Sequence, residues 1–170
     1  MIVSLIVAKA KNNAIGKDNS LLWHLPADMK FFRETTTHHC IITGRKNYES
    51  IPEKYRPLKD RTNIVVTRNK DFFEEGIHVC HSVEEAIKLA STLEKVETFI
   101  IGGGQIYKEV IEKDLVSKMY ITEVNEDFEA DTFFPDFDTS QWKTESTKKL
   151  PINEKNKFEA SIHTLINVSS

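Results

Sequence analysis

The chain has 170 residues, enough to bury a hydrophobic core within one domain without support from disulfides. Its 23 lysines and arginines against 26 aspartates and glutamates give a net charge of -3, so neither nucleic acid nor a membrane surface is expected as a partner. Cys40 and Cys80 stand in separate apolar runs, which favours buried free thiols in a reducing compartment over a disulfide framework or a metal site.

Apolar, β-branched runs alternate with helical patterns along most of the chain. The first run, residues 2–8, has no basic segment before it and is too short to cross a membrane, so it predicts a strand of a cytoplasmic protein. Further strands are predicted at residues 40–44, 62–67, 77–80, 98–103, 118–124 and 158–166. Helices are predicted at residues 27–36, 45–51, 82–94 and 104–113, the third with Ser82 as its cap.

This alternation predicts a single α/β domain over residues 1–170. Its central twisted sheet is expected to be mostly parallel, with about eight strands and with helices on both faces. After residue 114 the alternation stops, and two long strands with a polar connection indicate an antiparallel carboxyl-terminal edge. Sheets of this kind bind ligands at the carboxyl ends of their strands, so the residues after each strand are candidates for chemistry.

Three of these strand ends carry groups that suit an anion. Residues 102–104 are glycines between a strand and a helix, where a phosphate can approach backbone amides, although a merely tight turn is the alternative. Residues 44–46 and residues 67–68 supply arginine, lysine and hydroxyl groups after two other strands. Each pair alone suits an ordinary solvated surface, but three such ends on one edge indicate a long polyanion. Arginines and hydroxyls in place of a carboxylate favour a 2'-phosphate, hence NADP(H) over NAD if the ligand is a dinucleotide.

The stretch LLWHLPADMKFF, residues 21–32, sets one carboxylate, Asp28, among apolar side chains. The plain interpretation is an acid in the first turn of a helix that begins near Pro26. On that helix, however, Asp28 shares a face with Phe32, and a carboxylate on an apolar stripe must find hydrogen-bond donors or shift its pKa. A planar heterocycle with an amidine-like pair of N–H groups would satisfy both carboxylate oxygens.

Eight motifs then follow one another along nearly the whole chain. They are IVA at 6–8, IGKDN at 15–19, WHLPAD at 23–28, TGRKNYESI at 43–51, RPLKDRTNIVVTR at 56–68, IGGGQIY at 101–107, YIT at 120–122 and DTFFP at 131–135. In order and spacing they resemble the dihydrofolate reductase family of the bacterial chromosomal type. The resemblance implies that family's fold, NADPH-dependent reduction of 7,8-dihydrofolate to 5,6,7,8-tetrahydrofolate for one-carbon metabolism, and binding of antifolate inhibitors. It also implies a monomer with an adenosine-binding subdomain at roughly residues 39–95.

At the substrate end, the resemblance implies that Asp28 binds the pteridine, bridged by Thr122. Trp23 would hold a linked water and Leu21 would belong to a lid, which completes the candidate catalytic residues. Arg61 would pair with the glutamate carboxylate of the substrate. The candidate substrate-binding residues are Ile6, Val7, Asp28, Met29, Phe32, Ile51, Leu58, Arg61, Ile101 and Thr122.

At the cofactor end, the resemblance implies that Arg45, Thr67 and Arg68 read the 2'-phosphate. Residues 16–20 would form a mobile loop over the nicotinamide, and the Gly102–Gly103 peptide would be cis. The candidate cofactor-binding residues are Ala8, Ile15, Gly16, Asn19, Ser20, Gly44, Arg45, Lys46, Asn47, Thr67, Arg68, His81, Gly102, Gly103, Gly104, Gln105, Ile106 and Tyr107.

The implied chemistry is hydride transfer from nicotinamide C4 to pteridine C6, with a proton reaching N5 through water while Asp28 orients the ring. Two alternatives stay open: a same-fold NADPH-dependent pyrimidine reductase of flavin biosynthesis, and a nucleotide-binding module without turnover. The first has no need of Asp28 with Phe32 or of Arg61. Val7 and Met29 depart from the family's more frequent residues, so the resemblance does not carry over antifolate sensitivity.

Overall fold

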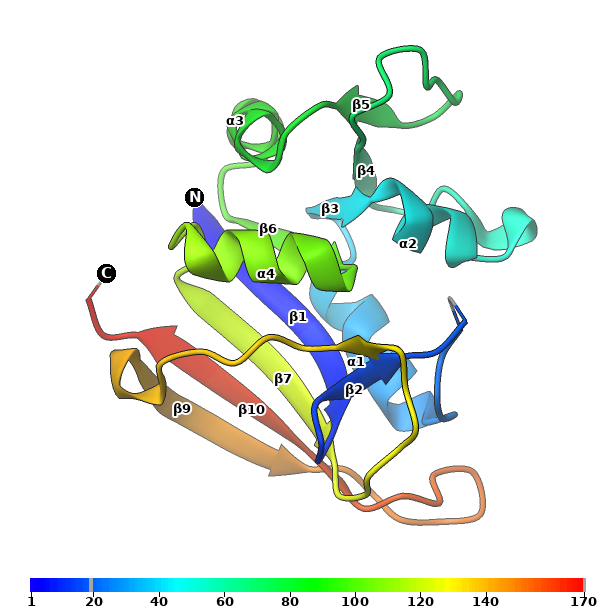
Figure 1. Cartoon of the computed structure of the whole chain (residues 1–170), viewed down its shortest axis with the longest axis vertical. Helices are drawn as coiled ribbons and strands as arrows, with labels where there is room; N and C mark the ends of the chain where they lie inside the picture. Colours follow the sequence, from blue (N-terminus) through cyan, green and yellow to red (C-terminus); the bar gives the residue numbers. More distant parts are fainter. Residues whose placement is uncertain (19, 170) are drawn as a thin grey trace.

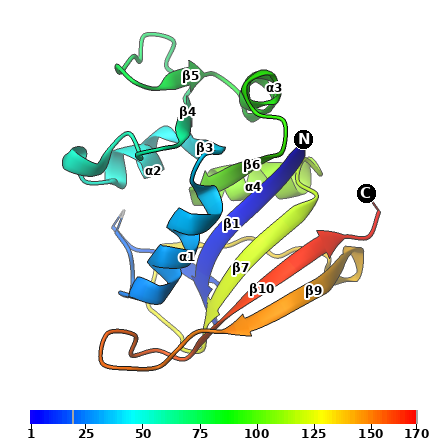
Figure 2. The same cartoon turned by 180° about the vertical axis from the view of Figure 1, so that it is seen from behind.

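A sheet of eight strands, in the order β5-β4-β3-β6-β1-β7-β10-β9, runs through the middle of the computed structural model (Figure 1), which describes residues 1–18 and 20–169. The strands are β1 (Ile2–Ala10), β3 (Cys40–Gly44), β4 (Thr62–Val66), β5 (His78–Cys80), β6 (Glu97–Gly102), β7 (Lys118–Val124), β9 (Trp142–Lys149) and β10 (Ala160–Asn167). From β5 to β7 all neighbours pair in parallel, whereas β10 pairs antiparallel with β7 and β9. The expected antiparallel edge, seen from behind in Figure 2, is thus confirmed.

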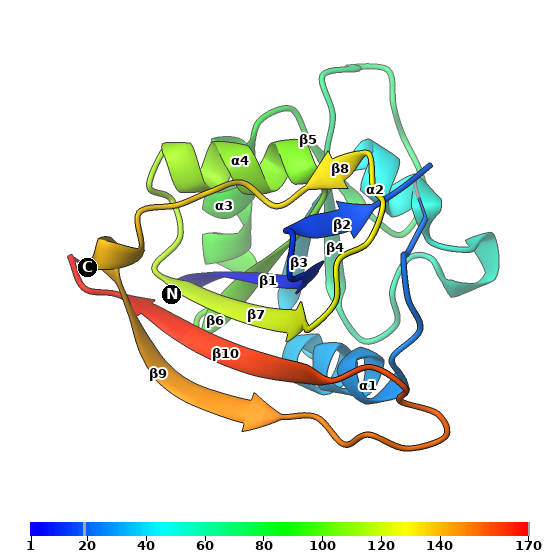
Figure 3. The same ribbon diagram turned by 60° about the horizontal axis from the view of Figure 1, so that its bottom comes forward.

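The helices cover both faces of this sheet, as the sequence predicted. They are α1 (Pro26–Thr36), α2 (Arg45–Ser50), α3 (Val83–Leu93) and α4 (Gly104–Glu112), with short 3-10 turns at Glu53–Tyr55 and Thr139–Gln141. Successive strand side chains point to opposite faces, so Leu5 of β1 packs with residues of α3 and α4 while Ile6 packs with Phe31 of α1. Figure 3 shows α1 and α4 on opposite sides of the sheet.

Three strands depart from the prediction. The polar connection expected before the last strand contains β9, whose sequence WKTESTKK is exposed apart from the partly buried Trp142. An edge strand is held by the backbone hydrogen bonds to its one neighbour and needs no apolar face. Its charged side chains therefore give no hydrophobic pattern from which the strand could be predicted. The other two, β2 (Ala14–Gly16) and β8 (Thr132–Phe133), pair in a short ribbon and are too short to show any periodicity.

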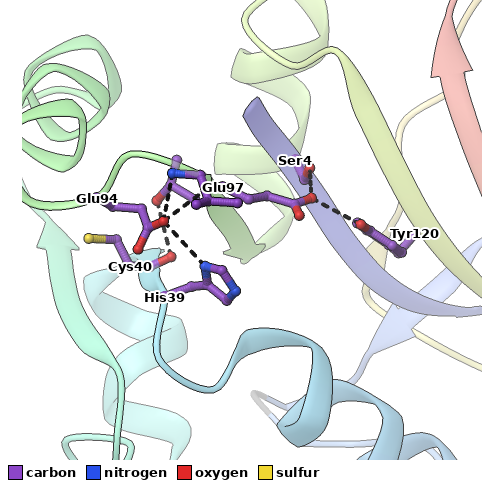
Figure 4. A network of polar contacts seen from close by, with 8 residues as sticks. Ser4, His39, Cys40, Glu94, Glu97 and Tyr120 are labelled. Carbon is purple, nitrogen blue, oxygen red and sulfur yellow. Dashed lines mark hydrogen bonds and ion pairs between the residues drawn. The ribbon is translucent and has the colours of Figure 1, made fainter. Parts of the chain in front are cut away.

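A polar network closes the amino-terminal ends of the parallel strands (Figure 4). Glu97, the first residue of β6, accepts hydrogen bonds from the hydroxyls of Ser4 and Tyr120. Glu94, at the end of α3, accepts the backbone N–H of Glu97 at 3.2 Å, and its Oε1 lies 3.5 Å from Nδ1 of His39. Because ligands meet such sheets at the opposite, carboxyl ends of the strands, this network serves the scaffold.

The two cysteines lie inside the core. Cys40 and Cys80 are buried and unbridged, as the sequence predicted, and burial raises the pKa of both thiols. Within residues 1–18 and 20–169, no helix is both long and apolar enough to span a membrane.

Candidate active site

Asp28 lies in the first turn of α1, where the sequence placed it, and faces strand β7. Its Oδ1 accepts a hydrogen bond from Oγ1 of Thr122 at 2.6 Å. The helix begins at Pro26 without a side-chain cap, and the backbone N–H of Ala27 donates to Oδ1 of Asn156 at 2.8 Å. A distant side chain therefore satisfies this helix end, and the carboxylate of Asp28 turns toward the sheet.

The electrostatic setting of Asp28 favours its neutral form more than water does. Burial raises the pKa of the carboxyl, and the hydrogen bond from Thr122 opposes part of that rise. The Tyr107 hydroxyl donates to the carbonyl oxygen of Ile6 at 2.8 Å, and burial, helped by Asp28, raises its pKa. Because a carboxylate accepts several hydrogen bonds, Asp28 is suited to a ligand that brings N–H donors to it.

An apolar wall stands beside this carboxyl. Phe32, Leu58 and Ile101 pack against the buried cluster of Ile6, Ile41 and Phe99, so four predicted substrate residues lie together, with Phe31 and Tyr120 beside them. Val7 and Thr122 are also buried, and Ile51 is partly exposed. Trp23 packs 5.2 Å from the ring of Phe128 in a second cluster. Leu21 and Met29 are 79% and 51% exposed, so both present apolar side chains to solvent at this end of α1.

Arg61 stands at the far end of the same wall. Its guanidinium carbon lies 5.9 Å from the ring centroid of Phe32, and its Nη1 donates to Oγ1 of Thr36 at 3.2 Å. The side chain of buried Asn63 fixes the loop before it, by bonding both backbone groups of Leu58 and the carbonyl of Arg61 at 3.0 Å each. Burial lowers the pKa of Arg61, although an arginine stays protonated in all ordinary conditions. The site thus ends in a partly buried cation.

Arg56, the first residue of the motif that contains Arg61, is held elsewhere. Its Nη1 donates to the carbonyl of Glu49 at 2.9 Å and its guanidinium carbon lies 5.7 Å from the ring centroid of Tyr48. The following Arg56–Pro57 peptide is cis. Arg56 is therefore tied to helix α2, while Arg61 points to the wall that carries Phe32.

The turn between β6 and α4 holds the three glycines. The Gly102–Gly103 peptide is cis, as the resemblance implied, and Gly102 has a φ of 126°. A Cβ on Gly102 would lie 3.2 Å from Nδ2 of Asn47, and one on Gly104 would lie 2.8 Å from Cγ2 of Thr132. At Gly103 the nearest atom would be 3.7 Å away, and α4 begins without a side-chain cap. The uncapped N–H groups and the bare backbone form a cradle that fits the phosphates of a nucleotide.

The predicted 2'-phosphate residues gather at the ends of two adjacent strands. β3 and β4 pair in parallel up to Gly44 and Val66, so Arg45 and residues 67–68 follow at the same edge. The guanidinium carbon of Arg45 lies 4.2 Å from the ring centroid of Phe72, and its Nε lies 3.4 Å from Oε1 of Glu49. This edge therefore offers an exposed Arg68, a hydroxyl and a stacked guanidinium to an anion.

Other predicted cofactor residues surround these. Nδ1 of His81 lies 2.9 Å from the carbonyl of Thr67, at the same edge as the basic groups. Asn47 donates to Oγ1 of Thr43 at 2.9 Å, beside the glycine turn. Ala8 is partly exposed on β1, and α4 carries Gln105 and Ile106 in its first turn.

The segment expected to cover the nicotinamide is held by strand pairing, an ion pair and a hydrogen bond to β8 and to the residues just before it. Ile15 and Gly16 belong to β2, which pairs with β8. Lys17 forms a 2.7 Å ion pair with Glu129, and the backbone N–H of Asp18 donates to Oδ2 of Asp131 at 2.8 Å. Ser20 donates its N–H back to the carbonyl of Lys17. Asn19 lies outside the described residues.

Three residues that support the site escaped the sequence interpretation: Asn63, Phe72 and Asn156. Asn63 is the one with a readable signal, because a polar residue inside the apolar strand TNIVV must satisfy its amide somewhere. Asn156 lies in the polar segment NEKN, which by itself indicates only a turn. Phe72 stands in a loop whose path brings it back to α2, and no local pattern encodes that path.

These features define a class of α/β proteins that hold a dinucleotide next to a planar heterocycle. The parallel strands end in a phosphate cradle and basic side chains, and a half-buried carboxyl lies beside an aromatic wall. The family model described as "Dihydrofolate reductase" matches residues 2–167. The chain belongs to the dihydrofolate reductase family.

Individual relatives agree with that family. The dihydrofolate reductase of Staphylococcus haemolyticus is 44% identical over 161 residues, covering 95% of this chain and 93% of its own length. That of Bacillus subtilis is 40% identical, covering 93% of this chain and 90% of its own length. The solved dihydrofolate reductase from Enterococcus faecalis, complexed with NADP(H) and RAB-propyl, superposes with a TM-score of 0.90 at 38% identity, covering 98% of this chain and 96% of its own.

Proposed function

We propose that this protein reduces 7,8-dihydrofolate to 5,6,7,8-tetrahydrofolate with NADPH. The observation that carries the proposal is the Asp28 carboxyl, partly buried, bonded to Thr122 at 2.6 Å and placed beside the wall that contains Phe32. Such a carboxyl matches a heterocycle with paired N–H donors, as the pteridine ring is. A pyrimidine reductase of the same fold would use neither this carboxyl nor Arg61.

At the substrate end, each proposed contact follows from the chemistry of the side chain. Asp28 receives the 2-amino and N3 hydrogens of the pteridine, and Thr122 holds the carboxylate in place. Phe32, Leu58 and Ile51 pack on the benzoyl ring. Arg61 binds the glutamate α-carboxylate as a bidentate partner, a geometry for which a guanidinium is well suited. The contacts that now fix Arg61, to Thr36 and to the Lys59 carbonyl, hold it ready for that partner.

At the cofactor end, the glycine cradle and α4 take the pyrophosphate, and Arg45, Thr67 and Arg68 take the 2'-phosphate. His81, beside Thr67, lies next to the adenine. Residues 39–95 thereby act as an adenosine-binding subdomain within one domain of residues 1–170. Support comes from the gathering of these groups at the carboxyl ends of β3, β4 and β6.

Bound NADPH supplies the hydride for pteridine C6, and N5 of the ring must gain a proton. Asp28 and Thr122 fix the orientation of the ring, and burial raises the pKa of the Asp28 carboxyl that faces it. A water held by Trp23 carries the proton toward N5. The segment of Ile15 to Asp18, with Ser20 and Leu21, excludes bulk water. Positioning and solvent exclusion of this kind lower a barrier by several kcal/mol.

The protein acts in the cytoplasm as a monomer on small molecules, with no nucleic acid or membrane partner, and it binds antifolate inhibitors in the pteridine pocket. The nearly balanced charge of the chain, with 23 basic and 26 acidic residues, supports the absence of a nucleic-acid or membrane partner. The half-buried Asp28 supports the binding of antifolate inhibitors, because diaminopyrimidine-type inhibitors present N–H donors to a carboxylate.

Three assays on the purified protein test this function. NADPH is mixed with 7,8-dihydrofolate, with the deaminated pyrimidine intermediate of flavin synthesis, or with buffer alone, and the loss of NADPH absorbance is followed. We expect turnover in the mixture with dihydrofolate and none in the other two. Turnover with the pyrimidine alone would assign the protein to the other reductase, and NADPH binding without turnover on either compound would make it a binding module.

A further inference from the structure

Phe72 covers one face of the Arg45 guanidinium at the edge of the proposed cofactor site. The guanidinium carbon lies 4.2 Å from the ring centroid, within the distance at which an arginine is attracted to an aromatic face. Phe72 is only partly exposed, whereas the next residue, Phe73, is 79% exposed. One of two adjacent, identical side chains is thus packed on a cation and the other meets solvent.

The turn after β4 delivers Phe72 to this place. The backbone N–H of Asn69 donates to Oγ1 of Thr67 at 3.2 Å, and Oδ1 of Asn69 accepts the N–H of Asp71 at 2.9 Å. The N–H of Phe72 itself donates to the carbonyl of Asn69 at 3.3 Å. The turn that carries Thr67 and Arg68 therefore also carries the aromatic ring. Because that ring packs on Arg45, Phe72 connects all three side chains that are proposed to bind the 2'-phosphate.

The far side of the loop is anchored as well. Gly76, with a φ of 87°, lies against the ring of Pro57. Glu74 lies beside the buried hydroxyl of Tyr48, whose pKa is raised by burial first and by Glu74 second. Because both sides of residue 72 are fixed against α2 and the loop that follows it, the ring is held over Arg45.

We propose that Phe72 is a positioning residue for Arg45 and thereby sets the preference of the enzyme for a cofactor that carries a 2'-phosphate. The inference rests on the proposed function, in which Arg45 reads that phosphate. Nε of Arg45 is buried, with Oε1 of Glu49 3.4 Å away, so the two Nη groups of Arg45 are the donors that a phosphate meets. A stacked guanidinium has already lost much of its conformational freedom, so it binds an anion at a lower entropic cost.

The test compares binding of NADPH and of NADH, which differ only in the 2'-phosphate. In Phe72→Leu the Kd for NADPH should rise by about tenfold, as expected for loss of one cation–π contact and its ordering effect. The Kd for NADH should change by less than about twofold, because that cofactor offers Arg45 no 2'-phosphate. Phe72→Tyr keeps the aromatic face and should retain the affinity of the wild type. Phe73→Leu is the matched control and should bind both cofactors normally.

A double-mutant cycle separates positioning from general damage. In an Arg45→Ala background, Phe72→Leu should leave the Kd for NADPH unchanged, because the ring no longer has a guanidinium to hold. Equal weakening of NADPH and NADH, normal NADPH binding by Phe72→Leu, or an undiminished effect without Arg45 would each overturn the inference and leave the proposed function standing. A wild type that binds neither cofactor would overturn both.

Discussion

Thr122 on strand β7 donates a hydrogen bond of 2.6 Å to Asp28 on helix α1, which joins the sheet to the first turn of the helix. Burial raises the pKa of Asp28 and this hydroxyl opposes the rise, because it stabilises the charged carboxylate. Thr122 thus fixes the orientation of the carboxyl and limits the rise of its pKa, at the end of the site where we propose that the pteridine binds.

Thr122→Val should raise the pKa of Asp28 further, since the valine fills the space and removes the donor. The pH dependence of the single-turnover hydride rate measures this, and its apparent pKa should move upward in the variant. Thr98→Val is the control, because the Thr98 hydroxyl bonds the carbonyl of Cys40 on the neighbouring strand, away from Asp28. An unchanged profile in Thr122→Val, or an equal shift in the control, would contradict the role given to this hydroxyl.

Asp28→Asn should make the fold more stable at neutral pH while it removes activity. The folded pKa of Asp28 lies above its ordinary value of 3.8, so folding disfavours the ionised form. Below a pH equal to that ordinary value, Asp28 therefore makes its full contribution to the free energy of unfolding of the wild type. This contribution is lost as the pH rises through the folded pKa. Urea unfolding from acid to neutral pH should show the variant gaining over the wild type as the pH increases. A variant that is less stable than the wild type at neutral pH would refute a raised pKa of Asp28 in the folded protein.

Arg61→Lys should weaken dihydrofolate binding, because an ammonium cannot make the paired hydrogen bonds of a guanidinium. We expect the KM for dihydrofolate to rise by about tenfold to hundredfold, with little change in the KM for NADPH. A dihydropterin that lacks the glutamate should be used equally well by both proteins. Arg33→Lys, an exposed change on α1, is the control. If the pterin also suffers, Arg61 acts on the fold and not on the carboxylate.

Replacement of Arg45 and Arg68 by alanine should reduce the affinity for NADPH much more than that for NADH. Each charge-assisted contact to the 2'-phosphate contributes about 1.5 to 3 kcal/mol, so the double variant should lose at least about a hundredfold in Kd for NADPH. Lys70→Ala removes a charge from the same exposed loop and should have little effect at physiological salt. Equal losses for the two cofactors would place these arginines on the pyrophosphate instead.

The fold could be predicted from the sequence wherever burial or capping leaves a local pattern. Ser82 accepts the N–H of Glu85 at 3.0 Å and caps α3 as expected, and the apolar strands lie where their runs predicted. Strand β9 was missed because an exposed edge strand needs a partner and no apolar face. For the candidate site, the gathering of residues that follow strands was predictable, since the topology brings strand ends together.

The residues that support the site could not be predicted from the sequence, because their partners are far away along the chain. Asn156 meets Ala27 across 129 positions of the chain, and Phe72 returns to Arg45 through a turn that only the complete loop determines. Periodicity describes which way a side chain points within one element. It carries no information about which distant backbone group or guanidinium that side chain will meet.

Product formation by the wild type and by Asp28→Asn shows whether this protein reduces dihydrofolate and whether Asp28 serves that reaction. Each purified protein is mixed with NADPH and 7,8-dihydrofolate, and tetrahydrofolate and NADP are quantified together. The wild type should form the two products one to one. Asp28→Asn should bind NADPH normally and turn over slower by a factor of about a hundred or more at neutral pH. A wild type that oxidises no NADPH would rule out the proposed reaction, and an Asp28→Asn variant with normal turnover would rule out the role of Asp28 in it.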